Sequence, residues 1–344
     1  MNARRRTAAL LEVLGVYLAG QLVTGQLIRF FGVSPVNPLE SFTAGISNTE
    51  LITATRQMFV LLMLQYAGYF VLIIPINWWY RRSGPAAYGL TKAGRSWTRL
   101  LLAGVATVAT AALIAWPATT LLMVDSVYKL GLGETVPWRQ AIFDTSWRRW
   151  EFWLFMAVLS FALIAVVEEI FFRGYCQRRL AEDWGDGPAI VGTALLFVFA
   201  HGQYLKPNAY NVSMIASVLI LAISFGVVFA WTRSLIPSMV AHALINIPMT
   251  PLWGALFLAA YVIGGVVVAK RGGLAVVKQV FADVSVPQCV ALGVVGAGWA
   301  IAAQRIGRLE LVAAAMVVLA VGLEVMDLRR DRAAKPASAV DSST

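Results

Sequence analysis

Residues 100–124 read LLLAGVATVATAALIAWPATTLLMV, an apolar run that contains no charged side chain. An α-helix needs roughly 20 mostly apolar residues to cross the hydrocarbon core of a bilayer, so this run is predicted to span a membrane. Further runs of the same character are 7–28, 57–79, 152–172, 189–204, 213–232, 234–250, 251–269, 286–306 and 309–328. The sequence therefore predicts an all-α fold, a polytopic integral membrane helix bundle of about 8–10 transmembrane helices.

The composition of the whole chain supports this fold class. Of its 344 residues, 59% are hydrophobic and 13% are charged, whereas soluble domains are roughly 45–50% apolar and about 25% charged. The composition therefore argues against a soluble enzyme, a disordered chain and a fibrous repeat. The net charge of +10 is attributed to basic cytoplasmic loops, so no nucleic-acid partner is expected.

Basic residues also predict how the chain is oriented. If Arg4, Arg5 and Arg6 lie in the cytoplasm and all ten runs cross the membrane, most of the 28 Lys and Arg residues fall on the cytoplasmic side. Such an excess is typical of the cytoplasmic loops of membrane proteins. We therefore expect both termini to be cytoplasmic.

Ionisable side chains inside the predicted spans are concentrated between residues 168 and 246. The stretches are AVVEEIFFR at 165–173, FVFAH at 197–201 and HALIN at 242–246, and they contain the only two histidines of the chain. We expect both histidines to lie inside apolar helices. An ionisable group inside a bilayer is costly and usually marks a functional site.

Helical spacing suggests a role for several of these side chains. Glu169 and Arg173 are four residues apart and are expected to form an ion pair. Glu168 points about 100° away from Glu169, has no such partner along the helix, and is therefore a candidate general base. His242 and Asn246 are also four residues apart and would present two hydrogen-bond donors, as an oxyanion hole requires.

His201 and the remaining acids complete the set of candidates. Phe197 precedes His201 by one helical turn and is expected to fix its ring. The predicted spans place Glu168 near the cytoplasmic end of its helix but His201 nearer the middle of the membrane, a mismatch that longer or tilted helices would remove. A Glu–Arg pair or a single histidine can also be purely structural, and we interpret Glu12, Glu324 and Asp327 as interfacial or helix-packing groups.

The three motifs resemble those of the CPBP family, which comprises CAAX proteases and bacteriocin-processing enzymes. That family carries Glu-Glu-x-x-x-Arg, Phe-x-x-x-His and His-x-x-x-Asn or -Asp, in this order. The stretches YGLT at 88–91, SFGVVFAW at 224–231 and SLIPS at 234–238 also resemble family segments. The likeness covers about 88–250.

This likeness divides the chain into four predicted parts. They are an N-terminal transmembrane extension at 1–87, a protease core at 88–250, C-terminal transmembrane helices at 251–328 and a disordered cytoplasmic tail at 329–344. The role of the first and third parts is left open.

The resemblance implies a glutamate-dependent intramembrane endopeptidase of a bacterial or archaeal cell membrane, acting without a cofactor. Glu168 would take a proton from a water that His201 helps to orient, while His242 and Asn246 would stabilise the oxyanion. Glu169, Arg173 and Phe197 would support the site. The mechanism requires a wet cavity in which one water can bridge the Glu168 carboxyl group and an imidazole.

Two alternatives use the same residues differently. A zinc-dependent intramembrane metalloprotease is the nearer one, although His-Glu-x-x-His is absent and Glu169 is better explained by Arg173. The other is a non-enzymatic transporter or immunity protein, although transporters usually show repeated halves and none is found here. The partner of an enzyme would be a membrane-associated protein or peptide within the lipid bilayer; whether it is prenylated is left open.

Overall fold

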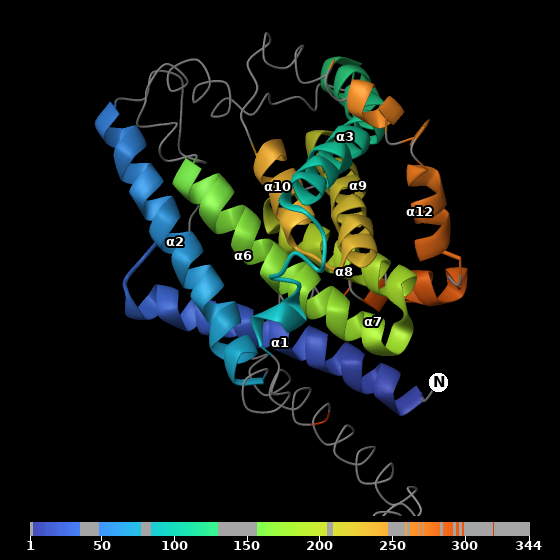
Figure 1. Cartoon of the computed structure of the whole chain (residues 1–344). Coiled ribbons are helices and arrows are strands. Elements are labelled where there is room, and N and C mark those ends of the chain that lie inside the picture. The colour runs from blue at the N-terminus through green and yellow to red at the C-terminus, as the bar shows by residue number, and fades with distance from the viewer. Residues whose placement is uncertain are drawn as a thin grey trace, which may run out of the picture.

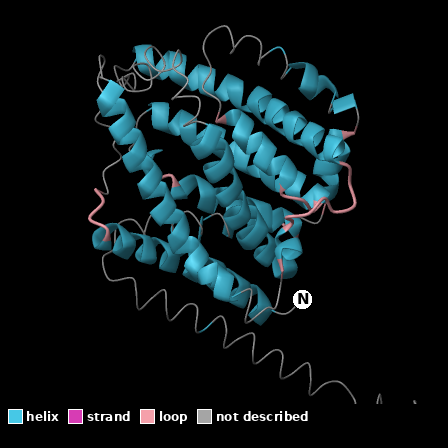
Figure 2. Cartoon of the chain, turned by 60° about the vertical axis from the view of Figure 1, so that its left-hand side comes forward, coloured by secondary structure: helices cyan, strands magenta, loops and turns pink. Residues whose placement is uncertain are grey.

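The computed structural model describes residues 3–34, 48–76, 84–129, 157–204 and 209–246, together with short stretches between 259 and 319. Regular structure in these parts is helical throughout and includes no strand, as the cyan ribbons of Figure 2 show. The predicted all-α fold class is confirmed. The spans predicted at 286–306 and 309–328 and the tail at 329–344 lie largely or wholly outside the described residues.

The regular elements of the described residues are all α-, 3-10 or π-helices. Their bounds are α1 Ala3–Phe30, α2 Asn48–Pro75, η3 Pro85–Tyr88, α3 Trp97–Lys129, η4 Ala157–Ile164, α6 Ala165–Glu169, η5 Ile170–Gln177, α7 Arg178–Trp184, α8 Asp186–Ala200, η6 Gly202–Tyr204, α9 Ala209–Thr232, α10 Ile236–Ile245 and α12 Gly273–Val280. The elements from η4 to α7 are continuous, and η4 and η5 have the wider turns of a π-helix. Such turns are rare and often occur at functional sites. Here they lie on both sides of α6, the short helix that contains Glu168 and Glu169.

Four of the described helices are long and apolar enough to cross a membrane. Their qualifying parts are Arg4–Phe30, Arg56–Pro75, Trp97–Ala115 and Asn211–Thr232, and α8 and α10 are shorter apolar helices. Large apolar side chains such as Ile74, Leu102 and Ile114 are exposed on α2 and α3. Apolar groups facing outward suit a lipid environment, so the chain is an integral membrane protein.

The helix that carries the two glutamates is longer than the sequence predicted. The predicted span ended at residue 172, whereas the helix continues to Trp184. Charged side chains in the added part lowered its hydropathy, but they are paired inside the protein. Arg173 contacts Glu169 at 2.9 Å, and Arg179 contacts both Glu12 at 2.8 Å and Asp183 at 2.6 Å. Pairing allows buried charges to stay in a helix that the protein covers.

A tight turn at Gly185 brings the first and second motifs to the same height along two neighbouring helices. Gly185 has φ +87°, a conformation that glycine adopts without steric penalty. Glu168 precedes this turn by 17 residues, and His201 follows it by 16. The two helices of this hairpin pack against each other, so the mismatch in depth that the predicted spans gave between Glu168 and His201 is removed.

The continuous helix from η4 to α7 runs through the middle of the bundle. In Figure 1 it lies between α2 on one side and α8, α9 and α10 on the other, while α1 passes below it. Helix α1 packs on α2 and α7, and α3 packs on α9 and α10. The described N-terminal helices therefore flank the same helix as the two histidine motifs.

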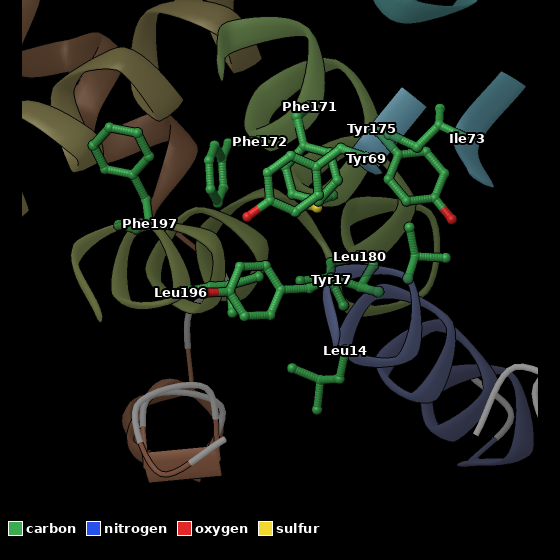
Figure 3. Close-up of a cluster of buried hydrophobic side chains, with 14 of the residues drawn as sticks. Leu14, Tyr17, Tyr69, Ile73, Phe171, Phe172, Tyr175, Leu180, Leu196 and Phe197 are labelled. Atoms are coloured by element: carbon green, nitrogen blue, oxygen red, sulfur yellow. The ribbon is translucent and has the colours of Figure 1, made fainter. Parts of the chain in front are cut away.

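Aromatic side chains join these layers (Figure 3). The rings of Tyr69 on α2 and Phe171 on η5 are 4.2 Å apart between centroids, and those of Phe172 and Phe197 are 4.9 Å apart at nearly a right angle. Tyr17 on α1 stacks on Tyr69 with centroids 6.1 Å apart. Such pairs contribute about 0.5–1.5 kcal/mol each beyond area burial, so they fix α2 and α8 against the central helix.

Candidate active site

Glu169 is a fully buried acid with two partners. Its side chain is 0% exposed, and its Oε1 accepts a hydrogen bond of 2.9 Å from Arg173, as the helical spacing predicted. The same oxygen also accepts a 2.9 Å hydrogen bond from Nδ1 of His242 on α10. This second contact was not predicted, because His242 is far from Glu169 in sequence. It joins the first motif to the third.

The contact with Glu169 determines which nitrogen of His242 can act in the site. Because a carboxylate oxygen accepts, Nδ1 of His242 carries the hydrogen. Nε2 is then an acceptor in the neutral imidazole and a donor when the ring is doubly protonated. This nitrogen lies 3.9 Å from Oε2 of Glu168. His242 thus lies between the two neighbouring glutamates.

Glu168 is held differently from Glu169. Its Oε1 accepts a 2.9 Å hydrogen bond from the Tyr66 hydroxyl, a partner on α2 that helical spacing could not reveal. Its Oε2 has no hydrogen-bond partner in the described part of the chain. No Lys or Arg among the described residues forms an ion pair with Glu168, whose side chain is 16% exposed. It is therefore a mostly buried acid with one oxygen left for another molecule.

His201 lies at the end of a helix and not inside one, which corrects the prediction. Helix α8 ends at Ala200, His201 has φ −82° and ψ 66°, and the short turn η6 begins at Gly202. The Nδ1 of His201 donates to the carbonyl oxygen of Phe197 at 2.7 Å. The two rings are 4.7 Å apart, so Phe197 contacts the imidazole as the spacing predicted and Nε2 is left for other contacts.

Asn246 also ends its helix. The predicted span continued to residue 250, whereas α10 ends at Ile245 and residues 247–250 are outside the described part. The backbone N–H of Asn246 still donates to the carbonyl oxygen of His242 at 3.3 Å. The spacing of one helical turn between the two side chains is therefore kept.

An aromatic cage surrounds Arg173. Its guanidinium lies 4.6 Å from the centre of the Phe197 ring and 5.3 Å from that of Phe225, and it donates to the carbonyl oxygen of Ala222 at 3.2 Å. Phe225 also stacks on His242, with centroids 5.5 Å apart. Phe225 was not predicted as a site residue, although the likeness had included it within residues 224–231. Cation–π contacts of this kind fix the guanidinium that holds Glu169.

The four predicted catalytic residues line one cavity of about 420 Å³. Glu168, His201, His242 and Asn246 form its polar part, and Tyr66 lies beside Glu168. Helix α2 supplies an apolar wall that includes Met58, Leu61 and Leu62. Since a water occupies about 30 Å³ in the liquid, the cavity has room for water and for part of a ligand. His242 lies close enough to Glu168, at 3.9 Å, for one water to bridge the carboxyl group and an imidazole, as the mechanism requires.

The zinc alternative requires several ligands that converge on one point. In the described part of the chain, no group of three or more His, Cys, Asp or Glu side chains is placed to hold a metal ion. Glu169, the best second acidic ligand in the zinc alternative, is already bonded to Arg173 and His242. A site without a cofactor therefore stays a prediction, with zinc as its alternative.

Comparison with known proteins places the motifs in a family. Residues 149–248 match the family of type II CAAX prenyl endopeptidases described as Rce1-like. The match contains all three motifs but leaves out α1, α2 and α3, and it is narrower than the likeness expected over 88–250. No curated protein and no solved structure matches the chain. Over residues 149–248, the resemblance to CAAX proteases of the CPBP type is therefore confirmed.

Proposed function

We propose that this protein is an intramembrane endopeptidase in which Glu168 activates a water to hydrolyse a peptide bond of a membrane-associated protein or peptide. The family match over residues 149–248 supports a peptidase of the CAAX-protease type. The observation that carries the chemistry is the 3.9 Å separation of Glu168 Oε2 and His242 Nε2 at the same cavity.

This separation suits a water held by both side chains. A water about 2.8 Å from each atom, the usual length of such hydrogen bonds, lies beside the line that joins them. Glu168 takes a proton from this water while the oxygen of the water bonds to the carbonyl carbon of the substrate. When the C–N bond breaks, Glu168 returns the proton to the leaving nitrogen. The products are a carboxyl group and an amine.

The other polar groups have separate roles in this mechanism. As the water attacks, Nε2 of His242 changes its partner from the water to the carbonyl oxygen, where it and Asn246 stabilise the negative charge. Because Nδ1 of His242 is used by Glu169, His242 can donate to this oxygen only as a doubly protonated ring. Such a ring and Arg173 would balance the charges of Glu168 and Glu169. His201 orients the water through Nε2.

Substitution of Glu168 tests the proposal. Glu168→Gln keeps the size of the side chain but cannot accept the proton, so we expect cleavage to fall at least about a hundredfold. Purified protein in liposomes is first assayed with a fluorogenic peptide that ends in a farnesylated CAAX sequence. Membrane proteomes of cells with the wild-type protein and with Glu168→Gln are then compared for shortened termini, to find substrates of other kinds.

Glu182→Gln is the matched control. Glu182 lies on the same continuous helix and is half exposed, outside the cavity, so its loss should leave cleavage unchanged. Cleavage by a Glu168→Gln protein at the wild-type rate rules out the proposed chemistry. Identical membrane proteomes and no cleavage of the peptide by the wild-type protein would rule out the peptidase itself.

A further inference from the structure

The only described side chain that donates a hydrogen bond to Glu168 comes from the N-terminal part of the chain. Tyr66 on α2 is 4% exposed, and its hydroxyl is 2.9 Å from Oε1 of Glu168. The two residues are 102 positions apart, and Tyr66 lies outside the segment that matches the peptidase family. The contact therefore joins Glu168 to a part of the chain whose role the sequence left open.

Helix α2 is closely packed against α1. A Cβ atom added at Gly68 would lie 2.3 Å from the Thr24 hydroxyl oxygen and 2.6 Å from the carbonyl oxygen of Gly20, so a larger residue at Gly68 does not fit this crossing. The Thr24 hydroxyl donates to the carbonyl oxygen of Gln65 at 3.2 Å, next to Tyr66. Small residues that let two helix backbones approach are a common means of packing in membranes.

Helix α1 is in turn fixed to the helix that carries Glu168. Arg179 donates to Glu12 at 2.8 Å, and the Tyr175 hydroxyl donates to the other oxygen of Glu12 at the same distance. Trp184 donates to the carbonyl oxygen of Arg6 at 3.0 Å. These contacts hold α1, and through it α2, in a defined position relative to Glu168.

The hydrogen bond from Tyr66 decides how the Glu168 carboxyl group is turned. With Oε1 held by the hydroxyl, Oε2 is the oxygen that remains on the side of His242, 3.9 Å from its Nε2. Without the hydroxyl, the carboxyl group can rotate about its terminal bond, because such torsions are broad. A general base is effective only when its oxygen is held within reach of the proton that it takes.

We propose that Tyr66 is a positioning residue for Glu168, and that α1 and α2 thereby complete the active site. This inference rests on the proposed function of Glu168. Tyr66 does not touch the reacting atoms; it acts by keeping one oxygen of Glu168 directed at the water.

The test compares two substitutions that each remove one hydroxyl. Tyr66→Phe removes the bond to Glu168 and keeps the ring. Tyr175→Phe is the matched control, since it removes a buried Tyr–Glu bond of almost the same length, outside the cavity. We expect Tyr66→Phe to lower kcat about tenfold, as for a lost hydrogen bond to a charged group, with KM within about twofold. Tyr175→Phe should lower Tm but leave kcat and KM unchanged, because Arg179 and Trp184 still fix α1 to the central helix.

A second measurement needs no substrate. The infrared band of the Glu168 carboxyl group, identified as the band that Glu168→Gln removes, should shift in Tyr66→Phe and stay in place in Tyr175→Phe. An unshifted band, an unchanged kcat or a change in KM alone would overturn the role of Tyr66. If Glu168→Gln is inactive while Tyr66→Phe cleaves normally, only this inference fails. If Glu168→Gln remains active, the proposed function itself fails.

Discussion

Two buried glutamates, Glu12 and Glu168, each accept a hydrogen bond from a tyrosine. Tyr175 donates to Oε1 of Glu12 at 2.8 Å, and Tyr66 donates to Oε1 of Glu168 at 2.9 Å. The difference is at the second oxygen. Oε2 of Glu12 is paired with Arg179, whereas Oε2 of Glu168 has no hydrogen-bond partner in the described residues and lies at the cavity.

This difference separates a structural acid from the acid that we propose as the general base. A buried carboxylate is stable when a cation and hydrogen bonds satisfy both of its oxygens, which is the state of Glu12. The interpretation of Glu12 as a helix-packing group agrees with these contacts. An unsatisfied buried oxygen carries a free-energy penalty and is expected mainly where function requires it. Oε2 of Glu169 lacks a partner as well, but Glu169 is fully buried beside Arg173 and does not line the cavity. The contrast therefore assigns stability to Glu12 and supports the proposed chemistry at Glu168.

The largest expected effect comes from removing the cation on the structural side. Arg179→Ala leaves Glu12 buried without its positive partner, which should lower the free energy of unfolding by about 3–5 kcal/mol. Thermal unfolding of the purified protein measures this loss. Glu168→Gln is the contrasting variant and should unfold at or above the wild-type Tm, because it replaces an unsatisfied acid with a neutral group. Equal losses of Tm in both variants would contradict the assignment of stability to Glu12 and chemistry to Glu168.

The next effect concerns the link between the two neighbouring glutamates. His242→Ala removes the side chain that contacts Glu169 and lies near Glu168, so kcat should fall about a hundredfold or more. Glu169 remains paired with Arg173, and the loss of Tm should be smaller than for Arg179→Ala. Steady-state kinetics and thermal unfolding on the same preparation separate the two quantities. A His242→Ala protein with wild-type kcat would remove the oxyanion role.

A smaller effect is expected at the aromatic ring that contacts three site residues. Phe197 lies against Arg173, His201 and His242, so Phe197→Leu should lower kcat about tenfold by loosening both imidazoles. Phe229→Leu is a suitable comparison for stability alone, since Phe229 is buried on α9 outside the cavity. The role of Phe197 is contradicted if the two variants lose Tm equally and Phe197→Leu keeps its full kcat.

The smallest effect is expected from metal removal. With a water activated by Glu168, incubation with EDTA followed by gel filtration should change the cleavage rate by less than about twofold. Metal analysis of the same sample by mass spectrometry provides the independent readout. Loss of activity that one equivalent of zinc restores would favour the zinc-dependent alternative over the glutamate mechanism.

Contacts along one helix were predictable from the sequence. Four-residue spacing indicated that Glu169 would meet Arg173 and that Phe197 would meet His201, because helix geometry places such residues on one face. Contacts between helices were not predictable in this way. The donor Tyr66 is one of 10 tyrosines, and nothing in its local sequence distinguishes it.

Helix boundaries show the same limit. Hydropathy ended the central helix at residue 172, because it treated Arg173 and Arg179 as charges that must face water. Their partners explain why the helix continues, and the partner of Arg179, Glu12, lies 167 residues away. Hydropathy is averaged over neighbouring residues of the chain. It therefore does not account for a charge that is paired with a residue of a distant segment.

The sequence by itself determined that the chain is a bundle of membrane helices and that its candidate site residues lie in three motifs. Composition and helical periodicity are local properties, and the bilayer permits few ways to satisfy a backbone. Only the tertiary structure decided that His242 lies between Glu169 and Glu168, and that Tyr66 donates a hydrogen bond to Glu168. These arrangements depend on the distance and rotation between packed helices, which no single stretch of sequence contains.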